Sequence, residues 1–225
     1  ADLIVLRKTC RELEAASHNA FARAYFTNRK YLFTRYGLQA LVDITKHPSL
    51  GRNVHNIYFV LERLSSYQYD PAREQYSIQG SNPPPDMTLV EWNRRKEKHA
   101  ARRTGAWANW QEEAAFLDDE APTTALIHQA FLALASLGTT TDIALTCSGS
   151  GVRTKQLLAA IGQKTSSSDL DHGDVNYASK CVLTAVVCSG LRSHKLMIGE
   201  YAELYGSLQA SAFQTSGALL PDLHT

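Results

Sequence analysis

The sequence predicts an α/β fold, an irregular solenoid of helix–strand units with a helical insertion. Three observations lead to it. Amphipathic helices alternate with short apolar strands along most of the chain. A motif recurs in which a helix is followed by a leucine, a few turn residues and a strand. A long, strongly helix-forming segment at 88–117 interrupts this alternation.

Composition places the chain among ordinary globular proteins. Of its 225 residues 44% are hydrophobic and 20% charged, and the formal net charge is +1. A balance so close to neutral argues against a nucleic-acid or anionic-membrane partner. No apolar run approaches the ~18–20 residues of a membrane span. The four cysteines form no C-x-x-C pair, which favours the reducing cytoplasm or nucleus.

The first third of the chain predicts one helix, two short strands, a second helix and a buried strand. A helix over 3–18 places Leu6, Cys10 and Leu13 on one face, and the aromatic stretch 21–34 suggests two strands around Asn28. A helix over 36–46 follows, and it ends at His47-Pro48 because the residue before proline disfavours the α region. Its expected inward residues are Leu38, Leu41, Val42 and Thr45, and the expected buried strand residues are Val54, Ile57 and Phe59.

The middle of the chain predicts an irregular excursion and then the helical insertion. Residues 65–86 are polar and end in a triple proline, which neither a helix nor a central strand tolerates. Thr88 and Glu91 form a capping-box pattern at the start of the helix. Gly105 leaves open a division into two helices.

The last hundred residues predict helices and strands in alternation. Helices are expected at 123–136, 152–161, 175–188 and 203–215, and strands at 142–147 and 194–198. Leu126, Ala130 and Leu134 are expected to share one side of the first of these helices. A loop rich in serine, aspartate and glycine is expected at 165–174.

The recurring motif aligns positions that are far apart in the chain. The leucines Leu50, Leu137, Leu191 and Leu220 are equivalent, and so are the strand positions Ile57, Ile143, Leu196 and Leu223. The last two strand positions are 27 residues apart, within the range of leucine-rich repeats, whereas the earlier intervals are longer. Each unit has an apolar face that only stacking can bury. A chance alternation in a compact α/β domain is the other interpretation.

Residues 6–59 carry a more specific pattern. The segment LRKTCREL is followed by FARAYF, by a helix ending in ITKHPSL and by a strand. This order resembles the region after the first F-box helix in fungal F-box and leucine-rich-repeat-like proteins. LIHQAFLALASL and CVLTAVVCSGLRSHKLMI resemble the later, degenerate repeats of that family.

The resemblance implies a substrate-receptor subunit of an SCF-type ubiquitin ligase. A Skp1-like adaptor would bind the F-box side, through Leu6, Cys10 and Leu13, and the repeats would bind a substrate protein. The sequence does not contain the opening L-P-x-E-type helix of an F-box, because residue 1 lies just before the second F-box helix that the resemblance implies. The implied division is an F-box-like helical remnant (1–20), a first α/β unit (21–64), the irregular loop and helical insertion (65–121) and degenerate repeats (122–225).

The insertion contributes the remaining candidate partner-binding residues. Trp92, Trp107 and Trp110 lie in it, and tryptophan is enriched at the energetic centres of interfaces. They are equally suited to packing the insertion onto the scaffold. Its charge is segregated, with six cations at 94–103 and five carboxylates at 112–120. This segregation fits a solvated helix face or contact with an acidic partner.

Three other features of the sequence bear on enzyme and metal-binding chemistry. The turn 147–155 resembles a phosphate-binding loop but lacks the third glycine of G-x-G-x-x-G, so a nucleotide-using enzyme is an alternative function. The calcium-loop-like run from Asp169 lacks the glutamate at position twelve. The eight histidines form no metal-binding pair. We therefore expect no cofactor, no metal and no catalytic residue, with an F-box-less, effector-like interaction protein as the second alternative.

Overall fold

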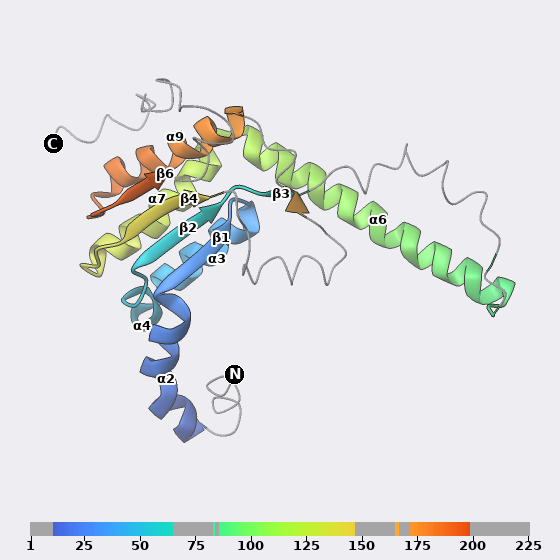
Figure 1. Cartoon of the computed structure of the whole chain (residues 1–225), viewed down its shortest axis with the longest axis horizontal. Coiled ribbons are helices and arrows are strands. Elements are labelled where there is room, and N and C mark those ends of the chain that lie inside the picture. The colour runs from blue at the N-terminus through green and yellow to red at the C-terminus, as the bar shows by residue number, and fades with distance from the viewer. Residues whose placement is uncertain (1–10, 65–82, 84–85, 147–164, 167–171, 199–225) are drawn as a thin grey trace.

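The computed structural model describes residues 11–64, 83, 86–146, 165–166 and 172–198, and these residues form a mixed α/β fold. The elements in chain order are α2 (Arg11–Phe26), β1 (Asn28–Leu32), α3 (Arg35–Lys46), α4 (Pro48–Gly51), β2 (Asn56–Val60), β3 (Arg63–Leu64), α6 (Leu89–Asp118), α7 (Glu120–Ser136), β4 (Asp142–Thr146), β5 (Thr165–Ser166), α9 (His172–Ser189) and β6 (Leu196–Ile198). Figure 1 shows a body of strands and helices from which α2 and the long α6 project.

Four strands of the body form one parallel sheet in the order β1-β2-β4-β6. Spatial order therefore follows chain order. Ile57, Ile143 and Leu196 are register partners across β2, β4 and β6. The predicted equivalence of these three strand positions is confirmed. The short strands β3 and β5 pair antiparallel in a separate two-stranded sheet.

One side of the parallel sheet, which we call the inner face, packs against α3, α7 and α9. Alternate strand residues point to it because side chains of a strand alternate between faces. Phe59 meets Phe131 of α7 and Phe33 edge-on, with ring centroids 6.3 and 5.9 Å apart. Residues of all three helices belong to the same buried cluster as these rings. The helices thus cover a single face, as Figure 1 shows with the strands in front of α3 and α7.

The helix α3 forms as the sequence predicted. Leu38, Leu41, Val42 and Thr45 are buried. The Thr34 hydroxyl caps the N-terminus by accepting a hydrogen bond from the Gly37 amide at 3.1 Å. The helix ends before Pro48, with extended backbone at the preceding residue. Local periodicity and stop signals were sufficient here.

The first helix and the strand after it differ from the prediction. α2 continues to Phe26, beyond the predicted end at residue 18, so of the two strands expected over 21–34 only the second forms, as β1. Alanines alternate with aromatics here, and alanine is the strongest helix former. Phe21 contacts Tyr25 and Phe26 at ring distances of 4.7 and 5.8 Å along the helix. Helical spacing, rather than strand alternation, brings these rings together. The boundary proposed at residue 20 falls inside α2.

Two further helix starts differ from the prediction, and the division at Gly105 that the sequence left open does not occur. α7 begins at Glu120 with Pro122 in its first turn, where a missing amide costs no intrahelical hydrogen bond. α9 begins at His172, earlier than the predicted residue 175. α6 runs unbroken through Gly105. A single exposed glycine costs only about 1 kcal/mol, too little to end a 30-residue helix.

The ends of α7 and α9 show the repeat at the level of single residues. Gly138 and Gly190 follow these helices with φ of 68° and 64°. A positive φ is the left-handed conformation that closes a helix and that glycine adopts without steric cost. Equivalent turns then lead into β4 and β6. Other predicted segments, namely the helices at 152–161 and 203–215, Leu220 and Leu223, lie outside the described residues.

Candidate interaction surface

The face of the sheet opposite α3, α7 and α9 is the first candidate surface, and we call it the outer face. The register assigns its side chains in rows across the strands. From the N-terminal end of the strands the rows are Asn28, Asn56 and Asp142, then Lys30, Tyr58, Ala144 and Met197, then Leu32, Val60 and Thr146. Among the described residues helices cover only the inner face, whereas all-parallel sheets are commonly covered on both faces.

The first row is polar and ordered. The Asn56 side-chain amide donates to the Asn28 side-chain oxygen at 2.6 Å. Asp142 is the register partner of Asn56 on the next strand. Amide and carboxylate groups in a row present donors and acceptors at the roughly 4.8 Å spacing of strands.

The second row combines aromatic, cationic and thioether groups. Tyr58 is half-buried at the centre of the sheet, with Lys30 beside it on β1. Ala144 is the register partner of Tyr58 on β4 and is buried, and Met197 is 39% exposed on β6. Tyrosine and methionine are enriched in protein interfaces, whereas lysine and alanine are depleted there.

In the third row Leu32 and Val60 are fully buried and form a small cluster of their own, whereas Thr146 is half-buried. In the first two rows every side chain except Ala144 is partly or fully exposed. These two rows are therefore the accessible part of the outer face.

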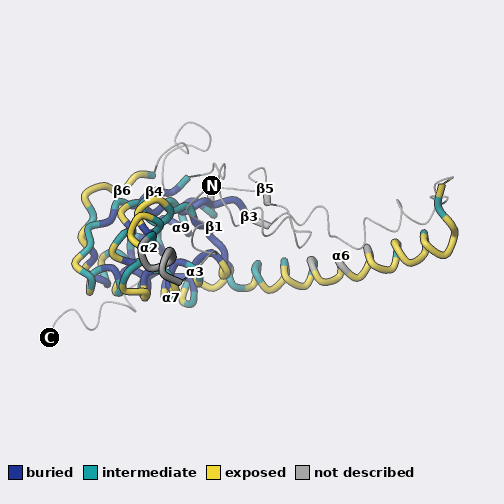
Figure 2. Tube along the Cα trace, turned by 90° about the horizontal axis from the view of Figure 1, so that it is seen from below, coloured by how far each residue is buried: buried dark blue, intermediate teal, exposed yellow. Residues whose placement is uncertain are grey.

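The second candidate surface is α6. Its N-terminus carries the predicted capping box: the Glu91 amide donates to the Thr88 hydroxyl, and the Thr88 amide donates to the Glu91 carboxylate. These hydrogen bonds hold the pKa of Glu91 below its usual value. Figure 2 shows that burial is concentrated in the body and that α6 is mostly exposed along its projecting length.

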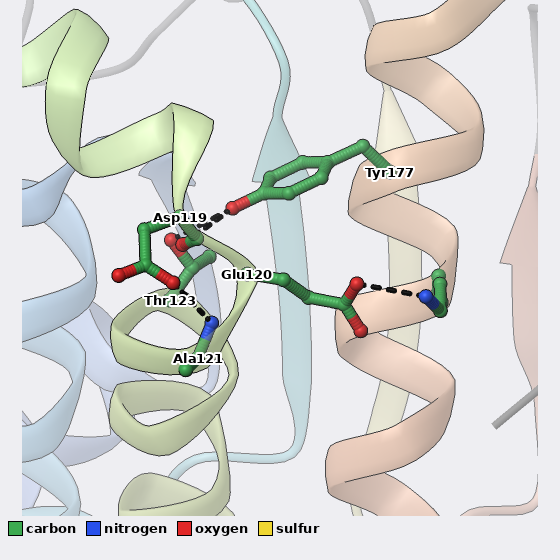
Figure 3. Close-up of polar contacts among 6 residues, drawn as sticks. Asp119, Glu120, Ala121, Thr123 and Tyr177 are labelled. Atoms are coloured by element: carbon green, nitrogen blue, oxygen red, sulfur yellow. Dashed lines mark hydrogen bonds and ion pairs between the residues drawn. The ribbon is translucent and has the colours of Figure 1, made fainter. Parts of the chain in front are cut away.

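A polar junction fixes the angle at which α6 leaves the body (Figure 3). Asp119 ends α6 and caps α7 by accepting from the Ala121 amide at 3.0 Å. The Tyr177 hydroxyl of α9 lies 3.0 Å from the Asp119 carbonyl oxygen and 3.1 Å from the Thr123 hydroxyl. Burial raises the pKa of Tyr177, so its hydroxyl stays protonated and can donate. Lys180 adds an ion pair to Glu120 at 2.7 Å.

The base of α6 also contacts α3. The Arg35 amide donates to the Glu113 carboxylate. Burial raises the pKa of Glu113. Phe116 and Leu117 of the last α6 turns join the main core. Only this end of the helix is tied to the body among the residues described.

The three predicted tryptophans lie on one face of α6. Trp107 and Trp110 stack, with ring centroids 4.8 Å apart and planes at 20°. Trp92 lies four turns earlier, and the Lys96 ammonium sits 5.2 Å from its ring centroid. None of the three belongs to the described core, which α6 joins through Phe116 and Leu117. The interpretation that these rings pack the insertion onto the scaffold gains no support from the described core.

The other predicted site residues fall outside what is described. Leu6 and Cys10 precede residue 11, and the side chain of Leu13 is not described. The whole of the turn 147–155 and residues 169–171 of the calcium-loop-like run also lie outside the described residues. Tyr58 and Lys30 of the outer face were not predicted as site residues. The sequence offered no clear signal for them, because neither NRKYL nor NIYFV alternates strictly between polar and apolar residues.

The part of the chain that the structure describes contains no group of three or more His, Cys, Asp or Glu side chains placed to hold a metal ion. Neither Cys181 nor Cys188 forms a disulfide. Burial raises the pKa of Cys181 to about 11, which disfavours the reactive thiolate at neutral pH. Within the described ranges, none of the helices has the length and apolarity to cross a membrane.

Comparisons with known proteins add no family. No family model, curated protein or solved structure matches the chain.

Proposed function

We propose that the chain is a protein–protein interaction scaffold, resembling the substrate-receptor subunit of an SCF-type ubiquitin ligase and performing no chemistry of its own. One observation carries the proposal. The parallel sheet is packed with helices on its inner face, while its outer face presents ordered rows of interface-type side chains around Tyr58.

Stacked helix–strand units support a leucine-rich-repeat-like solenoid with α6 as its insertion. Hydrogen bonds join the turns before the strands as well as the strands. The His55 amide donates to the Thr27 carbonyl at 3.1 Å, and the Asp142 amide donates to the His55 carbonyl at 2.8 Å. The Thr141 amide continues the series to the Arg192 carbonyl at 3.1 Å. In a solenoid each unit contacts its neighbours in this way, and the accumulated strands form an extended binding face.

The outer face is the proposed site for a substrate protein. Tyr58 lies centrally and is held by a strand whose alternate residues, Ile57 and Phe59, are fully buried. A site on rigid strands loses little conformational entropy when it binds. The polar row that begins with Asn28 and Asn56 supplies directional hydrogen bonds beside this ring.

The adaptor side rests on the sequence resemblance. It assigns a Skp1-like contact to Leu6, Cys10 and Leu13, at the start of the segment that continues into α2. A ligase receptor of this kind acts in the cytoplasm or nucleus, in agreement with the cysteine content.

A photo-crosslinking pair tests the outer face. Benzoylphenylalanine replaces Tyr58 on the outer face or, as the matched control, Tyr36, which is 55% exposed on the helical side. We expect adducts with a cellular protein at position 58 that excess unlabelled wild-type chain prevents and a Tyr58→Asp chain does not. Equal labelling at both positions would exclude the outer face as the specific site.

A second experiment tests the adaptor part alone. The full-length protein is mixed with a purified Skp1-like protein, and complex formation is measured by calorimetry with wild type and with Leu6→Asp/Cys10→Asp. Binding that the double substitution removes supports the ligase assignment. Absence of binding, with crosslinking at position 58 retained, would favour the F-box-less interaction protein instead.

A further inference from the structure

We infer that a cavity beside the first turns of α6 binds an acidic peptide segment of a partner protein, one that carries carboxylate side chains at alternate positions. The inference goes beyond the proposed function, because it assigns a ligand class to a surface remote from the sheet. It stands whether or not the outer face binds a substrate protein.

The first argument is the cavity itself, which we call the α6 cavity. It has a volume of about 680 Å³ and lies between the segment that enters α6 and the first three turns of the helix. Figure 1 places this end of α6 far from the sheet. A volume of this size lies within the range of ligand-binding pockets. The described residues that line it are Asp86, Met87, Glu91, Arg94, Arg95 and Lys98.

The second argument is that cations gather on one side of this cavity. Successive residues of an α-helix are about 100° apart, so Arg94, Arg95 and Lys98 lie on one face of α6. All three side chains are exposed. Within the described ranges, neither Arg94 nor Lys98 forms an ion pair. The α6 cavity therefore presents positive charge that the described part of the chain does not neutralise.

The two carboxylates of the cavity do not neutralise this charge either. Glu91 accepts hydrogen bonds from the amide and the hydroxyl of Thr88, at 3.2 and 2.8 Å, and so belongs to the capping box. Asp86 is exposed and has no hydrogen-bond partner among the described residues. The cavity thus offers cations for an anion and, in Asp86, an acceptor for a donor of the same ligand.

The spacing of the cations fits carboxylates at alternate positions of an extended peptide. Arg94 and Lys98 are four residues apart, which is about 6 Å along the helix axis. In an extended chain, side chains two residues apart lie on the same side and about 6.6 Å from each other. An Asp-x-Asp segment therefore places one carboxylate at each cation. The planar guanidinium of Arg94 can donate two parallel hydrogen bonds to the carboxylate that it meets.

Asp86 favours a peptide over a nucleic acid. A peptide carries backbone N–H groups that can donate to this carboxylate, whereas the phosphates of a nucleic acid only accept hydrogen bonds and are repelled by it. Met87, which is half-buried beside the cations, adds an adaptable apolar contact for a peptide. The formal net charge of +1 adds little long-range attraction for a polyanion.

A peptide titration of the full chain tests the site. The probe is a fluorescein-labelled Gly-Ser-Asp-Ser-Asp-Ser-Gly peptide, and anisotropy is measured at low ionic strength, where exposed charges are least screened. We expect binding that the matched Asn-Ser-Asn peptide weakens about tenfold and that Arg94→Gln/Lys98→Gln weakens about fivefold. Arg23→Gln/Arg52→Gln is the control, because it removes two exposed cations outside the cavity. Absence of binding by the wild type, or equal effects of both double variants, overturns the inference.

A second titration tests the ligand class. Asp86→Ala should weaken binding of the acidic peptide, because it removes the acceptor for the peptide backbone. If the cavity recognised negative charge alone, the same substitution would strengthen binding and overturn the peptide assignment. Tighter binding of an eight-nucleotide oligothymidylate than of the peptide would likewise overturn it in favour of nucleic acid. The Tyr58→Asp chain should bind the peptide like the wild type, which separates this site from the outer face.

Discussion

The body and α6 are stabilised in different ways although both contain long helices. In the body, α7 buries Ile127, Phe131 and Leu134 completely against the sheet and α3. α6 depends instead on a capping box at its tip and a junction at its base. The comparison teaches that helix formation and helix packing are separate requirements. A sequence can satisfy the first locally without satisfying the second.

The largest expected difference concerns the body core. Phe131→Ala should lower the free energy of unfolding by about 3–5 kcal/mol, because it removes a fully buried ring that contacts Phe59. Leu132→Ala is the neighbouring control, since that side chain is 45% exposed and should cost less than about 1 kcal/mol. Chemical denaturation measures both. Similar losses would mean that the inner face is not the main source of stability.

The junction should show an intermediate effect. Tyr177→Phe removes the hydroxyl between α9 and the Asp119 carbonyl, which should cost about 1 kcal/mol. Hydrogen exchange should accelerate at 116–121, where α6 meets α7. Tyr36→Phe, on exposed α3 surface, is the control and should leave both measurements unchanged. Acceleration confined to α9 would contradict the assigned role of the hydroxyl.

The tip of α6 should respond locally. Thr88→Ala removes the cap and should destabilise the first turn by about 1 kcal/mol. Amide exchange should rise at 89–92, while the global unfolding midpoint stays constant because the tip bears no core residue. Thr104→Ala, in the exposed middle of the same helix, serves as the control. A shift in global unfolding would show that α6 and the body form one cooperative unit.

The smallest expected effect is that of pH, which should change the stability of the two ends of α6 in opposite directions. The folded pKa of Glu91 is lowered by its hydrogen bonds to Thr88, so its contribution is present above the unfolded pKa and is lost as pH falls through the folded value. The folded pKa of Glu113 is raised by burial, so its contribution is present below the unfolded pKa and is lost as pH rises through the folded value. Acidification should therefore loosen the tip and tighten the base. Carboxyl carbon NMR titration measures both pKa values, and shifts of the same sign would contradict this assignment.

Much of the body could be predicted because its signals are local and repeated. The spacing of Leu38, Leu41 and Val42 specified the buried side of α3. The alignment of Ile57, Ile143 and Leu196 anticipated the strand register, since equivalent positions of stacked units become neighbours. The helical stretch 21–26 could not be predicted, because short aromatic segments fit both periods and neighbouring contacts decide between them.

The two candidate surfaces also differ in how far their residues could be predicted from the sequence. Sequence identified Trp92, Trp107 and Trp110 as interface-type residues, and the structure brings two of them into a stack while the third lies about 22 Å along the helix. It did not identify Tyr58 or Lys30, because a lone tyrosine or lysine in a strand carries no distinguishing pattern. The two side chains become neighbours only when β1 and β2 pair.

The sequence by itself determined the mixed α/β class, the end of α3, the cap of α6, and the equivalent positions of the strands. These features depend on residues a few positions apart or on repetition along the chain. Tertiary structure alone decided that α3, α7 and α9 gather on one face of the sheet, that Tyr58 lies half-buried on the other face, and that α6 leaves the body at Asp119. Those outcomes depend on which distant segments bury surface together, and burial is a property of the whole assembly of elements rather than of any one of them.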